Sequence, residues 1–148
     1  MGKISLQTGH VESYFLKLND TAQHKALWLK FTIYSPKGHP EKAVGEVWGI
    51  VFAANSPGVP MAFKQTFPIG DCKLATSDFS LRIGDCSLET GKTSGRLAGP
   101  AGELLWNLTF TPGEKELAHF PFGWMYKTKL PKSKIKTPSP SSRFTGAF

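Results

Sequence analysis

The chain has 148 residues, 40% of them hydrophobic and 12% aromatic, and a formal net charge of +7 at pH 7. This apolar content is enough to offset the entropy of ordering the chain, which excludes global disorder and favours one domain with one core. No stretch approaches the ~20 apolar residues that span a bilayer, and the first ten residues lack the apolar run of a signal peptide, so we expect a cytoplasmic protein without a transmembrane segment.

Alternation of apolar and polar residues, which is typical of strands with one buried face, dominates residues 12–111. It predicts strands over Ser13–Leu18, Ala26–Tyr34 and Val44–Ala53. The segment between the last two strands is rich in Pro, Ser and Gly, which are common in turns, so these strands are expected to form a hairpin.

The register of this hairpin depends on where its turn lies. A turn centred on Gly38 places Trp28 opposite Trp48 and Lys30 opposite Glu46, all on one face. An aromatic pair and a pair of opposite charges each stabilise a sheet by roughly 0.2–1 kcal/mol. A shift by one residue would move every side chain to the other face of the sheet, so the pattern predicts one register.

Further strands are expected between turn signals rich in Gly, Asn, Asp and Pro. They span Met61–Phe67, Phe79–Ile83, Cys86–Glu89, Ser94–Leu97 and Leu104–Phe110. About eight short strands at near-regular spacing predict an all-β fold, either an antiparallel sandwich or an up-and-down barrel. A short helical turn is expected only over residues 114–119.

The composition changes near the C-terminal end of the chain. Six of the eighteen basic residues and none of the eleven acidic ones lie in residues 127–148, so residues 1–126 are nearly neutral. We therefore expect a β domain over 1–126 and a basic, Pro-, Ser- and Lys-rich extended tail or linker over 127–148. No aromatic residue separates the tail lysines, which disfavours nucleic acid as a partner; binding of nucleic acid or protein through the tail stays an alternative.

One face of the hairpin combines large aromatic rings with two opposite charges. In a small barrel such a face can line a cavity for one apolar ligand, and the same residues can equally fill an ordinary core. The residues expected to bind a ligand are Trp28, Lys30, Thr32, Tyr34, Glu46, Trp48 and Phe52, with Ile50 on the same face.

Motifs of catalytic chemistry are absent from the sequence: it has no Gly-rich phosphate loop, no nucleophile elbow and no His pair at helical spacing. The four histidines are scattered, and Cys72 and Cys86 lack metal-ligand spacing, so no metal or cofactor is expected and both thiols should be reduced. Glu12 and Glu46 are candidate catalytic acids, because burial against aromatic rings would raise the carboxyl pKa and allow it to protonate an alkene.

Seven segments spread over nearly the whole chain carry a family resemblance. They are Glu12–Lys17, Ala26–Thr32, Gly45–Trp48, Lys64–Pro68, Leu104–Phe110, Lys134–Pro140 and Arg143–Gly146. Together they resemble a family of two-domain lipocalin-like proteins, which includes the AttH-like proteins, the carotenoid hydratases and, more distantly, the tocopherol cyclases. The characteristic positions of this resemblance are Glu12, Trp28, Lys30, Glu46, Trp48, Lys64 and Trp106, and it adds Trp106 to the expected ligand-binding residues.

The resemblance implies a lipocalin-like (calycin-like) barrel and an apolar or isoprenoid-like ligand. Family members carry a second barrel with a Gly-His-Asn-Trp-type motif, and this chain ends before such a motif, so it resembles the N-terminal half. The implied function is binding of an apolar small molecule, or partnership with a second lipocalin-like domain or a second copy in a homodimer, without catalysis by this chain alone. The alternative is one half of an isoprenoid hydratase or cyclase that uses a buried carboxyl acid.

Overall fold

The computed structural model describes residues 9–54, 58–129 and 133–148. Within these residues the chain consists of strands and short 3-10 turns, without an α-helix. The elements in chain order are β1 (His10–Asp20), β2 (Lys25–Ser35), η1 (Pro40–Lys42), β3 (Val44–Ala53), β4 (Met61–Pro68), η2 (Ile69–Asp71), β5 (Cys72–Ala75), β6 (Ser80–Ile83), β7 (Cys86–Glu89), β8 (Lys92–Gly99), β9 (Gly102–Thr111), β10 (Leu117–Ala118), η3 (Gly123–Tyr126), β11 (Lys136–Thr137) and β12 (Arg143–Ala147).

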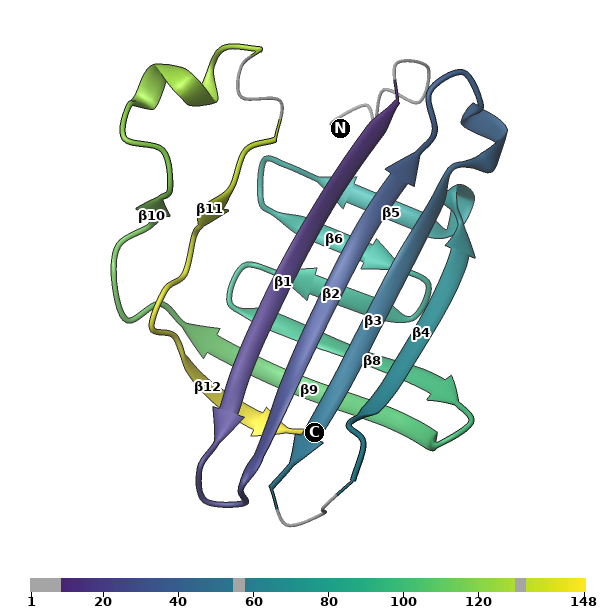
Figure 1. Ribbon diagram of the computed structural model, residues 1–148, viewed down its shortest axis with the longest axis vertical. Coiled ribbons are helices and arrows are strands. Elements are labelled where there is room, and N and C mark those ends of the chain that lie inside the picture. The colour runs from purple at the N-terminus through teal and green to yellow at the C-terminus, as the bar shows by residue number, and fades with distance from the viewer. Residues whose placement is uncertain (1–8, 55–57, 130–132) are drawn as a thin grey trace.

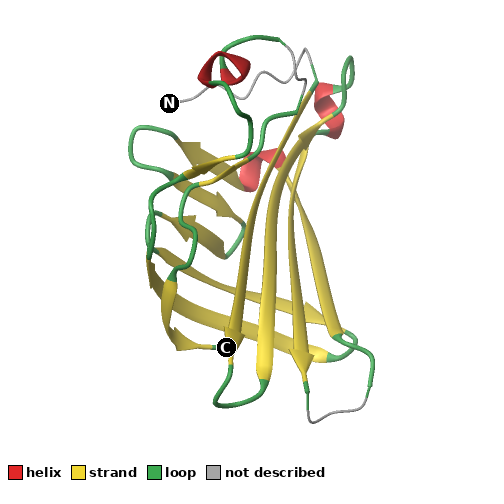
Figure 2. Cartoon of the chain, turned by 60° about the vertical axis from the view of Figure 1, so that its left-hand side comes forward, coloured by secondary structure: helices red, strands yellow, loops and turns green. Residues whose placement is uncertain are grey.

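The strands form two main sheets that face each other. The first sheet has the order β1-β2-β3-β4, the second has the order β12-β9-β8-β7-β6-β5, and β10 pairs with β11 in a small separate ribbon. All pairs are antiparallel, and the strands of the two main sheets cross at a steep angle (Figure 1 and Figure 2). None of these sheets closes into a barrel within the described residues. The predicted all-β antiparallel fold is confirmed, and a sandwich agrees with the two layers.

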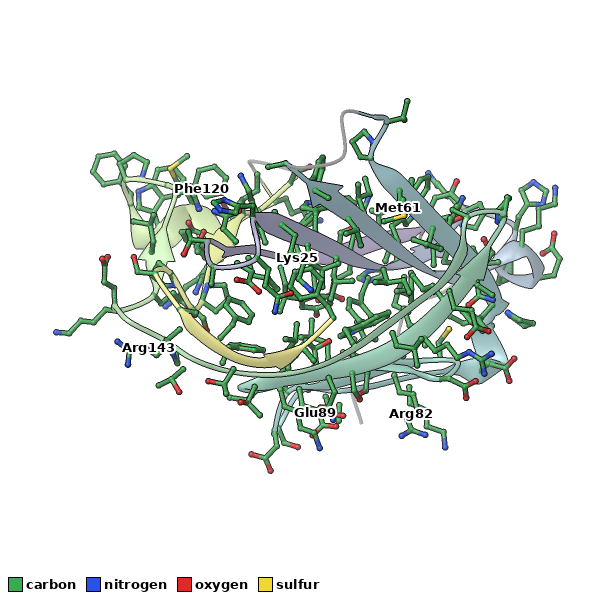
Figure 3. All side chains as sticks on the ribbon, turned by 90° about the horizontal axis from the view of Figure 1, so that it is seen from below. Lys25, Met61, Arg82, Glu89, Phe120 and Arg143 are labelled. Atoms are coloured by element: carbon green, nitrogen blue, oxygen red, sulfur yellow. The ribbon has the colours of Figure 1, made fainter. Side chains whose placement is uncertain are left out.

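The core lies between the two sheets, where side chains from both layers meet (Figure 3). The centre comes from β2, because Leu27, Leu29, Phe31 and Ile33 alternate along the strand and are each 0% exposed. Arg82 of the second sheet points away from this layer (Figure 3). The other core residues are Leu16, Leu18, Val47, Phe63, Leu81, Ile83, Cys86, Leu88, Leu97, Leu104, Trp106 and Leu108.

The β2–β3 hairpin forms as predicted, but the expected register is wrong by two residues. Lys30 lies opposite Trp48, and Trp28 lies opposite Ile50. The connecting loop contains a turn closed by the His39 amide, which donates to the Pro36 carbonyl at 3.2 Å, and then η1. These turns centre the loop one residue beyond the expected glycine. A shift of the centre by one residue moves the register by two, so every side chain keeps its expected face.

The C-terminal segment, expected to be an extended tail or linker, returns to the second sheet. β12 pairs with β9 along the edge of the second sheet, and the Phe144 ring packs on Phe110 with 5.3 Å between ring centroids. The segment expected to be a linker contains β11 and leads back to the second sheet. The helical turn expected over 114–119 does not form, and this region contains β10 instead. The local sequence is rich in Pro, Ser and Lys because most of the segment crosses the surface, whereas the apolar residues at its end join the core.

Close packing of the core requires glycine at several inward positions of the strands. A Cβ atom built on Gly49 would lie 2.4 Å from Leu104 Cδ2, across the sandwich. A Cβ atom on Gly95 would lie 2.4 Å from the Trp106 ring and 2.8 Å from Cys86 Sγ. The indole is held in the core by its Nε1, which donates a hydrogen bond to Thr93 Oγ1 at 3.0 Å, so the ring cannot easily move aside.

We expect Gly95→Ala to destabilise the protein by about 1–3 kcal/mol, because the added methyl group overpacks the core against a fixed indole ring. Gly70→Ala is the matched control, since a Cβ at that position meets no atom within 4 Å. The measurement is urea-induced unfolding followed by circular dichroism. Equal stability of the two variants would contradict the packing described here.

Candidate ligand-binding face

The structure brings seven of the expected ligand-binding residues together on one face of the first sheet, which we call the outer face. They alternate with the core residues of β2 and β3, so strand geometry alone puts them on one side. This face points away from the second sheet, and the expectation that it lines an enclosed interior is wrong. These residues are Trp28, Lys30, Thr32, Tyr34, Glu46, Trp48 and Phe52.

There is a simple physical reason why this face of the first sheet points outward and the opposite face points into the core. The central residues of the other face of β2 (Leu27, Leu29, Phe31 and Ile33) are aliphatic or aromatic and can be buried without loss of hydrogen bonds. Burial of Lys30 and Glu46 between the sheets would remove water from two charges. The free energy of this desolvation can exceed the Coulomb attraction within one ion pair. The apolar face therefore packs inward and the mixed face remains outside.

A row of alternating aromatic and cationic side chains crosses all four strands of the outer face. Phe15, Lys30, Trp48 and Lys64 are successive partners on β1, β2, β3 and β4. Lys30 Nζ lies 5.5 Å from the Phe15 ring centroid, and Lys64 Nζ lies 4.7 Å from that of Trp48. Each ring thus has a cation within range of a cation–π interaction.

Glu46 is the anion of this face, and its neighbours keep it ionised. Lys64 Nζ lies 2.8 Å from Glu46 Oε1, and Trp48 Nε1 donates a hydrogen bond to Oε2 at 3.4 Å. The hydrogen bond from Lys64 is the main reason that the pKa of Glu46 is lowered, and it outweighs the opposite effect of partial burial. The expectation that aromatic surroundings would raise this pKa is therefore wrong, and the carboxylate is poorly suited to donate a proton.

An open groove lies on the outer face beside this row. It has a volume of about 390 Å³ and is lined by Lys17, Ala26, Leu27, Trp28, Ile50 and Phe52. At Ala26 and Phe52 it adjoins a second open depression that extends to Val59 and Met61 at the start of β4. The rings of Phe15 and Trp28 lie 5.9 Å apart along its border. The groove is thus mainly apolar, with a lysine ammonium group at its edge.

Glu12 lies apart from the outer face. On β1 it alternates with the outward residues, and its carboxylate accepts a hydrogen bond from the Tyr14 hydroxyl and lies 3.1 Å from His10 Nε2. The pKa of Tyr14 is raised, first by burial and then by Glu12. The two candidate acids, Glu12 and Glu46, therefore occupy opposite faces of the first sheet and do not form one site.

Trp106, the eighth expected residue, belongs to the core. It is 3% exposed, and its ring meets Phe31 edge-on with 6.4 Å between centroids. The sequence did not predict Phe15 and Lys17 as part of the site. Both are outward-facing residues of β1. The pairing of β1 with β2, which places them beside Lys30 and Trp28, is the information that was missing.

The described residues show no group of three or more His, Cys, Asp or Glu side chains that could hold a metal ion, and both Cys72 and Cys86 are free thiols. No helix in this part of the chain has the length and apolar character needed to cross a membrane. Comparison of the chain with models of protein families, with curated proteins and with solved structures finds no match.

We expect Glu46→Gln to lower the stability at neutral pH by less than about 1 kcal/mol, because the ion pair with Lys64 is largely solvated. The folded state lowers the pKa of Glu46, so the carboxylate stabilises the fold above its unfolded pKa, and this contribution is lost as the pH falls through the folded-state value.

The difference between the wild type and Glu46→Gln should therefore shrink between neutral pH and a pH of about 3, below the ordinary pKa of Glu. Urea unfolding at the two pH values measures it. Glu89→Gln serves as the control, since Glu89 forms no ion pair within the described residues. A deficit of the same size at both pH values would show that Glu46 does not act through its charge.

Proposed function

We propose that this chain is a lipocalin-like β domain that binds an apolar small molecule in the groove on its outer face and is not catalytic by itself. The observation that carries the proposal is the gathering of Trp28, Ile50 and Phe52 around an open groove. Small-molecule sites are commonly concave and lined by aromatic and aliphatic side chains, with few polar groups to orient the ligand.

The exposure of large apolar side chains supports a binding role for this face. Phe15 is 60% exposed and Phe52 is 43% exposed, although both belong to regular strands with a well-packed opposite face. Scattered apolar residues on a surface need no explanation, but contiguous aromatic patches often mark binding sites. The adjoining depression extends this surface toward Met61, which suits an elongated ligand such as an isoprenoid chain.

The lipocalin-like assignment is supported by the order of the strands. Strands β1 to β4 are sequential neighbours in the first sheet and strands β5 to β9 in the second, and η2 connects β4 of one sheet to β5 of the other. Up-and-down barrels use the same connectivity with closed edges. The family resemblance of the sequence agrees with this connectivity.

Catalysis by the outer face is disfavoured by its charge state. An acid that protonates an alkene must carry a proton at the working pH, whereas Lys64 keeps Glu46 ionised. Lys30 and Lys64 also place positive charge next to the rings, which would oppose a carbocation formed nearby. We therefore favour a binding function over one half of a hydratase or cyclase.

The test is titration with cis-parinaric acid, a fluorescent polyene with an apolar chain and one carboxylate. Trp28→Ala and Phe52→Ala should each weaken binding by about tenfold, as expected for aromatic anchors of a site. Leu105→Ala is the matched control, because Leu105 is 57% exposed but lies on β9 in the other sheet. Binding unchanged in both aromatic variants, or lost equally in the control, would exclude the groove as the site.

A further inference from the structure

A separate part of the molecule carries a second exposed aromatic cluster. Between β9 and β12 the chain leaves the second sheet and forms β10, η3 and β11, which we call the arm. The arm stands to one side of the two sheets, and its labelled Phe120 lies at the same end in the view from below (Figure 1 and Figure 3). It has no part in the groove proposed above.

The arm is held together by its own contacts around Tyr126. The Tyr126 hydroxyl accepts a hydrogen bond from the Phe120 amide at 3.0 Å and donates one to the Ile135 carbonyl at 3.1 Å. The Phe120 and Tyr126 rings lie 5.0 Å apart, and Lys136 Nζ lies 5.1 Å from the Tyr126 ring centroid while pairing with Glu116 at 2.8 Å. The Phe120 and Tyr126 rings therefore have structural partners within the arm.

Among the described residues, two other rings of the arm have no such partners in the two sheets. Phe122 and Trp124 stack on each other with 6.4 Å between centroids and 14° between ring planes, and each is 59% exposed. Ile135 of the arm is 60% exposed as well. The contrast with Trp106, which is buried in the core, shows that the fold buries its aromatic rings where the sheets can cover them.

Positive charge accompanies the exposed rings. The Lys127 amide donates to the Trp124 carbonyl at 2.9 Å, and Lys134 Nζ donates to the Tyr126 carbonyl at 2.6 Å, so both lysines belong to the η3 turn region. Lys129 follows in the chain. Within the described residues none of these three pairs with a carboxylate, and no acidic residue occurs from 117 to 148.

We propose that this tip of the arm, formed by Phe122, Trp124, Lys127, Lys129 and Lys134, docks onto an anionic lipid surface. Aromatic rings with a polar edge settle at the level of lipid headgroups, and lysines beside them are attracted to the negative charge of the leaflet. The positive charge is complementary to an anionic surface. Lys127 and Lys129 follow η3 in the chain, and Lys134 is hydrogen-bonded to it, so apolar rings and cations lie close together.

A lipid surface fits these residues better than a single-stranded nucleic acid. Bases stack on the open faces of aromatic rings, but Phe122 and Trp124 each use one face against the other. The exposed Ile135 adds aliphatic surface, which a bilayer interface accepts and a base does not require. A bilayer would also be a natural source of an apolar ligand, although the docking proposal stands without the groove.

The experiment is flotation of the full chain with vesicles of phosphatidylcholine, alone or with phosphatidylserine. The wild type should bind the anionic vesicles and lose this binding at high salt. Phe122→Ser/Trp124→Ser and Lys127→Gln/Lys129→Gln should each reduce binding at least about tenfold. The matched control Phe15→Ser/Lys17→Gln removes an exposed ring and a cation from the outer face and should bind vesicles like the wild type.

Circular dichroism and cis-parinaric acid binding of the arm variants should match the wild type, which separates loss of docking from loss of the fold or of the groove. Wild-type binding by the Phe122/Trp124 variant, or an equal loss in the outer-face control, would overturn the proposal. So would Trp124-dependent binding of a single-stranded oligonucleotide in a protein that does not float with anionic vesicles.

Discussion

The packing of the inward row of β2 against the second sheet determines how the rest of the molecule is arranged. Leu27, Leu29, Phe31 and Ile33 are fully buried, and burial of side chains of this size contributes roughly 1.5–3 kcal/mol each. A one-residue slip of β2 would exchange this row for one that contains Lys30 and Trp28. Because the apolar row can face only inward, the charged and aromatic row must face solvent, and the outer face is a consequence of the core.

Once the outer face is exposed, its chemistry follows from cross-strand neighbours. The register places Lys30 between Phe15 and Trp48, and it places Lys64 beside both Trp48 and Glu46. Lys64 therefore contributes to an ion pair and to a cation–π contact at once. The result is an aromatic surface whose single anion is neutralised, which suits an apolar ligand better than proton transfer.

The strands could be predicted from local alternation, whereas the pairing between distant segments could not. Alternation is a local signal, and it correctly predicted that Leu29 and Trp28 lie on opposite faces of β2. Alternation by itself does not say which face lies inward; that choice follows from the cost of burying the charges of Lys30 and Glu46. The hairpin register depended on the turn at His39, and the return of Phe144 to the second sheet depends on β9, more than thirty residues earlier.

The same return of the chain explains how the arm can act as a defined surface. β9 and β12 are paired neighbours, so the arm leaves and rejoins the second sheet at one edge. A segment tied at both ends loses less conformational entropy when it is fixed on a surface than a free tail would. The pairing of β12 with β9 thus anchors the second end of the arm. Without it the segment would be a solvated basic tail, whereas with it the arm presents Phe122 and Trp124 from a fixed base.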